Sequence, residues 1–173
     1  LHADNKLRSE EDQQMGKTSL AAALDQVDSI HGPIYYLTDD LFLGRSLRMY
    51  GEWAKRELDF LSFLLEPGMT VIDVGAFIGT HTLTFSRLIG PEGKVYVFEP
   101  VPMHFEILQK NLEVNGLSNV SVINCGLSDE KGEIYVDCFS AGEQQSFGSF
   151  CLNEKLTGEN RQRIILNTLD NYQ

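Results

Sequence analysis

The pattern that most constrains this chain is an alternation of short apolar strands with helical segments. Three runs rich in β-branched residues alternate with two segments whose apolar side chains recur at helical spacing. In chain order, they are Met69–Val74, Gly79–Ile89, Lys94–Phe98, His104–Asn115 and Val120–Asn124. This order predicts a βαβαβ unit, and therefore an α/β fold with a parallel sheet and flanking helices.

The flanks of this unit have a different texture. Residues 1–20 mix charges of both signs with few apolar side chains, which predicts a mobile polar tail. Tyr50–Gly68 is predicted as a helix that Pro67-Gly68 ends. After the unit, we expect hairpin-like strands at Gly132–Cys138 and Arg163–Asn167, with a loop at Ser140–Ser149 between them. The predicted organisation is a tail followed by one incomplete domain, residues 21–173, whose cofactor-binding core spans residues 67–130.

Composition narrows the classes of partner. The 173 residues carry a net charge of −11, which disfavours nonspecific binding to nucleic acid. No apolar run approaches the length of a membrane span. Cys125, Cys138 and Cys151 are odd in number and form no C-x-x-C pair, so neither a fully paired disulfide framework nor a zinc site is expected. Reduced thiols favour a cytoplasmic location.

The candidate ligand-binding residues lie where the predicted strands end. Gly75 and Gly79 are spaced as in a tight strand-to-helix turn, where glycine lets the chain bend and lets the helix approach the strand or a ligand. Free N–H groups at that helix start favour an anionic or polar ligand group. Glu99 ends the second strand, where a carboxylate can accept both hydroxyls of a ribose. Turn and carboxylate together predict a cofactor that contains adenosine.

Two residues distinguish between such cofactors. Nicotinamide-binding turns use G-x-G-x-x-G, whereas Phe77 stands at the middle glycine here. The Asp73 carboxylate would repel the pyrophosphate of a dinucleotide, but it suits a ligand that carries an ammonium group. The methionine end of S-adenosylmethionine is such a ligand. We therefore predict S-adenosylmethionine as the cofactor, with a nicotinamide dinucleotide as the disfavoured alternative.

From about residue 50 to residue 173, the chain resembles the FkbM-type, S-adenosylmethionine-dependent methyltransferases, which have a Rossmann-like fold. The resemblance rests on VIDVGAFIGTHTLTFSRL, on VYVFEP and the residues that follow it, and on ILNTLDNY. It implies methyl transfer to an oxygen of a small-molecule or glycan hydroxyl, and it identifies no catalytic base. The cofactor-binding residues that it implies are Asp73, Gly75, Ala76, Phe77, Gly79 and Thr80 in the first motif, Glu99 and Pro100 at the ribose, and Leu127 and Ser128 beside the adenine.

The chain departs from this family at two places. Related methyltransferases place an Asp after the third strand, where it meets the adenine amino group. This sequence has Cys125-Gly126 there, so a backbone group or Asp129 would have to bind the adenine instead. The family continues beyond the Thr-Leu-Asp segment with a further strand, whereas here three residues follow Asp170. We therefore expect the N-terminal half of a methyltransferase domain. Its strand Met69–Val74 would be an exposed sheet edge through which the protein associates with itself.

Other candidates have less specific roles. His81 is expected on a helix surface or in contact with the cofactor, and His104 is expected to be exposed. Glu52, Trp53 and Glu57 could line a pocket, although core packing is favoured for Trp53. Two other functions remain open, namely a non-catalytic binding module of the same fold and methyl transfer to nitrogen or carbon.

Overall fold

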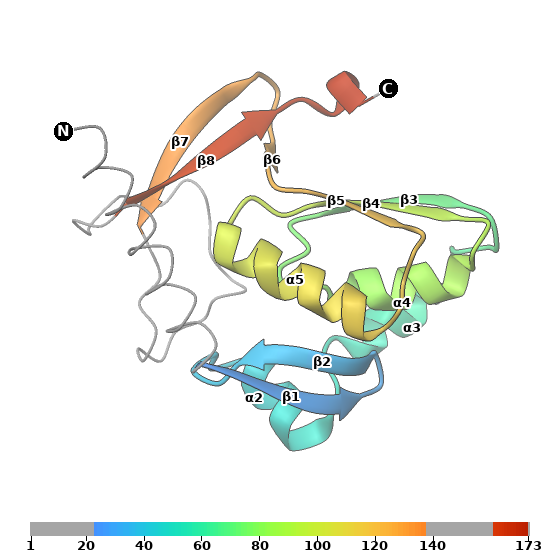
Figure 1. Cartoon of the computed structure of the whole chain (residues 1–173). Coiled ribbons are helices and arrows are strands. Elements are labelled where there is room, and N and C mark those ends of the chain that lie inside the picture. Colours follow the sequence, from blue (N-terminus) through green and yellow to red (C-terminus); the bar gives the residue numbers. More distant parts are fainter. Residues whose placement is uncertain (1–22, 138–160, 173) are drawn as a thin grey trace.

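A computed structural model describes residues 23–137 and 161–172 of the chain (Figure 1). The predicted tail at residues 1–20, the loop Ser140–Ser149, Cys138 and Cys151 lie outside the described residues. Within the two described ranges, no helix is both long and apolar enough to cross a bilayer.

The predicted βαβαβ unit is confirmed. Its strands are β3 (Thr70–Val74), β4 (Lys94–Phe98) and β5 (Val120–Ile123), and its helices are α4 (Thr80–Ile89) and α5 (Pro102–Val114). The strands pair in parallel in the order β3-β4-β5, with each β3 residue opposite a β4 residue from Thr70↔Lys94 to Val74↔Phe98. The fold is an α/β fold of the Rossmann-like kind.

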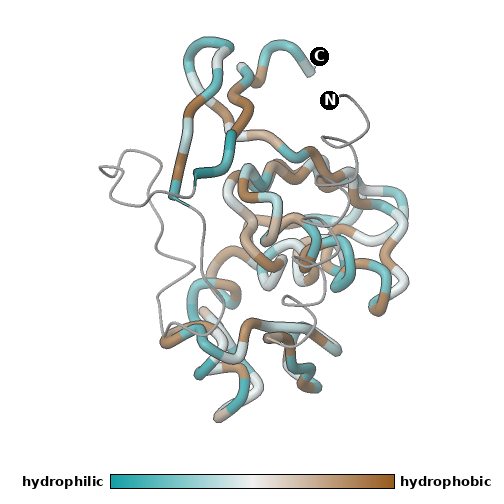
Figure 2. Tube along the Cα trace, turned by 60° about the vertical axis from the view of Figure 1, so that its left-hand side comes forward, coloured by the Kyte–Doolittle hydropathy of each residue, from teal (hydrophilic) through white to brown (hydrophobic). Residues whose placement is uncertain are grey.

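The two faces of this sheet differ. Helices α4 and α5 lie together on one face (Figure 1), where Val95 and Val97 are fully buried with apolar residues of the helices. On the other face, Ile72 and Val74 are exposed, and no helix of the described residues covers them. Figure 2 shows hydrophobic residues running through the central strands and helices, with hydrophilic residues where β7 ends and β8 begins.

A unit that the sequence did not predict packs below the helices in Figure 1. It consists of an antiparallel hairpin of β1 (Leu24–Ser29) and β2 (Gly32–Leu37), followed by α2 (Leu43–Tyr50). Asn111 of α5 is fully buried and fixes the hairpin: its amide donates to Tyr35 O at 3.0 Å, and its Oδ1 accepts from Tyr35 N at 2.6 Å. We call residues 23–54 the hairpin unit.

The helix predicted over Tyr50–Gly68 is too long. The structure has α2 ending at Tyr50 and α3 (Lys55–Ser62) beginning after an irregular link. Gly51 and Ala54 take left-handed backbone conformations, with φ of 65° and 53°, which interrupt the helix on both sides of Trp53. Spacing of apolar residues does not reveal such a break, because the side chains on either side keep a helical period.

The predicted strands after the unit are confirmed and form a second sheet. It contains β6 (Gly126–Leu127), β7 (Gly132–Asp137) and β8 (Arg161–Asn167) in the order β6-β8-β7. The β6–β8 pair is parallel and the β7–β8 pair is antiparallel. A short 3₁₀ helix, η2 (Leu169–Tyr172), follows, and the Tyr172 ring packs edge-on against Phe98 of the central sheet at 5.1 Å.

Candidate functional site

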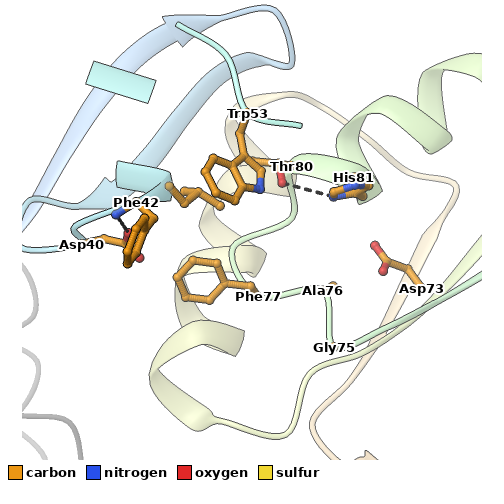
Figure 3. Close-up of a pocket in the computed structure, with 10 residues that line it drawn as sticks. Asp40, Phe42, Trp53, Asp73, Gly75, Ala76, Phe77, Thr80 and His81 are labelled. Carbon is orange, nitrogen blue, oxygen red and sulfur yellow. Dashed lines mark hydrogen bonds between the residues drawn. The ribbon is translucent and has the colours of Figure 1, made fainter. Parts of the chain in front are cut away.

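A cavity of about 490 Å³ lies at the carboxyl end of β3 (Figure 3), the end at which ligands bind in open parallel sheets. The β3–α4 turn and the hairpin unit supply its walls. The residues that line it are Asp40, Phe42, Leu43, Trp53, Asp73, Gly75, Ala76, Phe77, Thr80 and His81.

Half of the predicted cofactor residues line this cavity. They are Asp73, Gly75, Ala76, Phe77 and Thr80, from the end of β3, the turn after it and the first residue of α4. Gly75 has a φ of 78°, and a Cβ built on it would meet nothing within 4 Å. Glycine is therefore favoured there by the backbone conformation, while the space beside it is open to a ligand.

Asp73 reaches the cavity from β3. The Thr82 hydroxyl of α4 donates a hydrogen bond of 2.6 Å to Asp73 Oδ2, which orients the carboxylate. Burial raises the pKa of Asp73 above its usual value, and the hydrogen bond from Thr82 opposes this shift only in part. Burial destabilises the ionised form of this carboxylate, and a ligand that brings a cation or hydrogen-bond donors would stabilise that form.

Glu99 follows β4, at the predicted strand end, but does not line the cavity. Its carboxylate accepts the Phe77 N–H at 2.8 Å and the Val101 N–H at 3.0 Å, and it lies 3.4 Å from His104 Nδ1. The residue is 3% exposed. In this structure, Glu99 therefore holds Phe77, a non-glycine residue with a φ of 54°, in its strained conformation.

The remaining predicted residues lie outside the cavity. A Cβ on Gly79 would come within 2.5 Å of Leu108 Cδ1, so this glycine serves the packing of α4 against α5. Pro100 accepts the Asn124 amide, and the Ser128 N–H donates to Asn167 O beside β8. Leu127 belongs to β6, opposite Asn167.

Of the expectations for His104, Trp53 and His81, the one for His104 is wrong. His104 is buried rather than exposed, and its ring packs edge-on against Phe77 with centroids 4.5 Å apart. Trp53 packs against the core, as favoured, and it also lines the cavity, the alternative role. His81 lines the cavity from the start of α4, and its Nε2 lies 3.6 Å from Glu57.

The hairpin unit contributes a wall that sequence reasoning missed. Asp40 and Phe42 come from the connection between β2 and α2, and Leu43 is the first residue of α2. In the sequence, Asp39-Asp40 before the apolar residues 41–43 is the one signal of this wall, and the same pattern precedes many helices.

A buried histidine positions Trp53. The backbone N–H of Trp53 donates to His31 Nε2 at 3.3 Å, and His31 Nδ1 lies 3.2 Å from the Thr84 hydroxyl of α4. Burial, with a smaller effect from His81, lowers the pKa of His31 to about 4. His31 is therefore neutral at physiological pH, and it joins the hairpin unit to α4.

Comparison with known proteins agrees with this geometry. The family model for protein-L-isoaspartate(D-aspartate) O-methyltransferase matches residues 53–129, the stretch that contains the turn and the central sheet. This central unit is similar to methyltransferases. The expected likeness to S-adenosylmethionine-dependent methyltransferases is confirmed, although the model that matches is not the FkbM type.

Individual relatives match the same region. Methyltransferase sdnD of Sordaria araneosa is 37% identical over 70 residues, which are 40% of this chain and 27% of that protein. Protein-L-isoaspartate O-methyltransferase of Methanothermobacter thermautotrophicus is 36% identical over 78 residues, which are 42% of this chain and 36% of that protein. A solved S-adenosylmethionine-dependent methyltransferase from Aquifex aeolicus is 29% identical with a TM-score of 0.38, covering 50% of this chain and 42% of that one. The chain thus spans about a third of the length of the curated relatives it matches.

Proposed function

We propose that this protein is an S-adenosylmethionine-dependent methyltransferase that methylates a hydroxyl oxygen. The observation that supports this most is the cavity at the carboxyl end of β3, where the Asp73 carboxylate meets the open side of Gly75. The residues present fit the cofactor: a buried carboxylate with a raised pKa suits an ammonium group. The similarity of residues 53–129 to methyltransferases points the same way.

In this proposal, the turn residues bind and orient the cofactor. Asp73, held by Thr82, accepts hydrogen bonds from the ammonium, and Gly75 leaves room for the ligand beside the turn. When bound, S-adenosylmethionine supplies a methyl group already activated by its sulfonium. The protein's main contribution is then to hold donor and acceptor close and aligned. The roles of Glu99 and Pro100 at the ribose, and of Leu127 and Ser128 at the adenine, stay predictions.

The charge of the cavity disfavours an anionic acceptor. Its described lining contains two aspartates and neither Lys nor Arg, so a carboxylate acceptor would meet like charge. The relatives named for L-isoaspartate suggest protein carboxyl methylation as a second candidate. We favour the hydroxyl because the described lining has neither Lys nor Arg to hold a carboxylate, and its His81 lies 3.6 Å from Glu57. Within the S-adenosylmethionine-dependent methyltransferases, we propose that the chain belongs to the FkbM type.

Calorimetry with S-adenosylhomocysteine and with NAD tests the cofactor. Binding of the former and not the latter is expected, and the reverse would favour a nicotinamide-binding domain. A methyl-transfer assay with hydroxyl, amine and carboxyl acceptors then tests the reaction. Binding without transfer to any acceptor would favour a non-catalytic module, and transfer to amines alone would favour nitrogen methylation.

We also propose self-association through the β3 edge. Among the described residues β3 pairs on one side with β4, and its side chains Ile72 and Val74 are exposed. Such edges recruit further strands. Sedimentation at several concentrations should show a concentration-dependent oligomer, whereas a monomer throughout would contradict this part of the proposal.

A further inference from the structure

The two oxygens of the Asp40 carboxylate have different surroundings. It lies between β2 and α2 in the hairpin unit and is 3% exposed. Its Oδ1 accepts the Phe42 N–H at 2.9 Å and the Gly44 N–H at 3.2 Å. The backbone is confined as well, because a Cβ on Gly44 would lie 2.5 Å from Leu37 O. Asp40 is therefore held in one orientation.

The second oxygen of Asp40 points to a ligand. Oδ2 is buried and has no hydrogen-bond partner among the described residues, while the residue lines the cavity. A buried acceptor left unpaired lowers the stability of the protein, so a native structure that contains one invites an explanation. A ligand group that donates a hydrogen bond from within the cavity would supply the missing partner.

The two carboxylates of the cavity occupy different places. Asp73 comes from β3 beside the turn, whereas Asp40 comes from the hairpin unit, and Figure 3 shows them on opposite sides of Trp53 and Phe77. Phe42 lies beside Asp40 in this view, and the rings of Trp53 and Phe77 lie between the two carboxylates, where they offer flat apolar contact. One cavity thus contains a polar anchor for each of two ligands.

We propose that Asp40 Oδ2 binds the hydrogen-bond-donating group, a hydroxyl or an ammonium, of a small aromatic methyl acceptor. This proposal rests on the proposed function, in which Asp73 serves the cofactor. Of the described lining residues that can carry charge, Asp40 and Asp73 are acids and His81 is a base next to Glu57. The Asp40 end therefore selects against acceptors that present a carboxylate.

The fluorescence of Trp53 can report binding, because Trp53 lines the cavity and is the one Trp of the chain. Its emission, excited at 295 nm, is followed while benzyl alcohol, benzylamine or benzoate is added, three probes that share a ring and differ in the polar group. We expect saturable changes with the alcohol, the amine or both, and none with benzoate at the same concentrations. Which of the first two binds more tightly separates a hydroxyl from an ammonium. Equal binding of benzoate, or no binding of either donor, would overturn the proposal.

The variant Asp40→Asn tests the residue itself. Asn can keep an oxygen towards the Phe42 and Gly44 N–H groups, but it presents an NH₂ group where Oδ2 was. We expect the Kd of the donor probes to rise about tenfold or more. The control Asp28→Asn removes the same charge at an exposed position of β1 and should leave binding unchanged. Unchanged probe binding in Asp40→Asn would refute the role of Asp40, and if that variant does not fold, the comparison of probes on the native protein still decides.

Calorimetry with S-adenosylhomocysteine separates this proposal from the proposed function. Asp40→Asn should bind it as the native protein does, and a loss would assign Asp40 to the cofactor and overturn the acceptor role. Failure of the native protein to bind S-adenosylhomocysteine would instead contradict the methyltransferase, whatever the probes show.

Discussion

The two walls of the cavity are built in different ways. One wall is a continuous strand, turn and helix start, in which Asp73, Gly75 and Thr80 are neighbours in sequence. The other comes from the hairpin unit, where Asp40 and Trp53 are brought together by α2 and held against α4 and α5 by His31 and Asn111. The turn wall is therefore specified locally, whereas the hairpin wall depends on tertiary contacts. Changes to each wall should affect different properties of the protein.

The largest effect is expected at the support of the turn wall. Glu99→Ala leaves the part-buried N–H of Phe77 and the buried N–H of Val101 without an acceptor, which should cost roughly 2–5 kcal/mol of the free energy of unfolding. Binding of S-adenosylhomocysteine should weaken as well, because Phe77 loses its restraint. Chemical denaturation and calorimetry measure the two. A variant as stable as the native protein would show that Glu99 is free for a ligand and not committed to the turn.

Asp73→Asn should separate function from stability. Because burial raises the pKa of Asp73, its ionised form disfavours the folded state at neutral pH, and removing the charge should raise the melting temperature. Binding of S-adenosylhomocysteine should weaken by about 1.5–3 kcal/mol through loss of the charged acceptor. The exposed Asp28→Asn serves as the charge control. If stability rose and affinity stayed the same, the ammonium would have to bind elsewhere.

Gly75→Ala should have a smaller effect. Its φ of 78° costs a residue with a Cβ about 1–2 kcal/mol, and the added methyl group points into open space beside the cavity. Both stability and ligand affinity should therefore fall, whereas Gly79→Ala should reduce stability alone through its contact with Leu108. Thermal unfolding with and without S-adenosylhomocysteine measures the difference. Equal ligand-induced stabilisation of native protein and Gly75→Ala would contradict a ligand beside Gly75.

The smallest effect is expected for the titration of His31 in the hairpin wall, which changes the free energy of unfolding at acidic pH. His31 has its pKa lowered to about 4 from 6.5, so the unfolded chain binds more protons than the folded protein between those values. The stability that its neutral form provides is complete above pH 6.5 and is lost as the pH falls towards 4. In His31→Asn, the free energy of unfolding should depend less steeply on pH in that window, as followed by urea denaturation at several pH values. Identical slopes in both proteins would show that His31 is not the group that titrates.

The βαβαβ unit and its turn could be predicted because their signals are local. The apolar runs that became β3, β4 and β5 need a buried, parallel environment, and Gly75 needs a backbone conformation that few other residues adopt. Each of these requirements is expressed by a residue type at its own position. The cavity residues that the sequence identified lie together for the same reason.

Tertiary structure decided the rest. Glu99 stands at the predicted strand end, yet which donors its carboxylate meets depends on how the turn folds back over β4. The hairpin unit escaped prediction because its place is set by contacts such as Asn111 with Tyr35, between residues 76 positions apart. Asp40 acquires its unpaired oxygen in the same way, since sequence places it before a helix, and only the packing of the hairpin unit against α4 and α5 places it in the cavity.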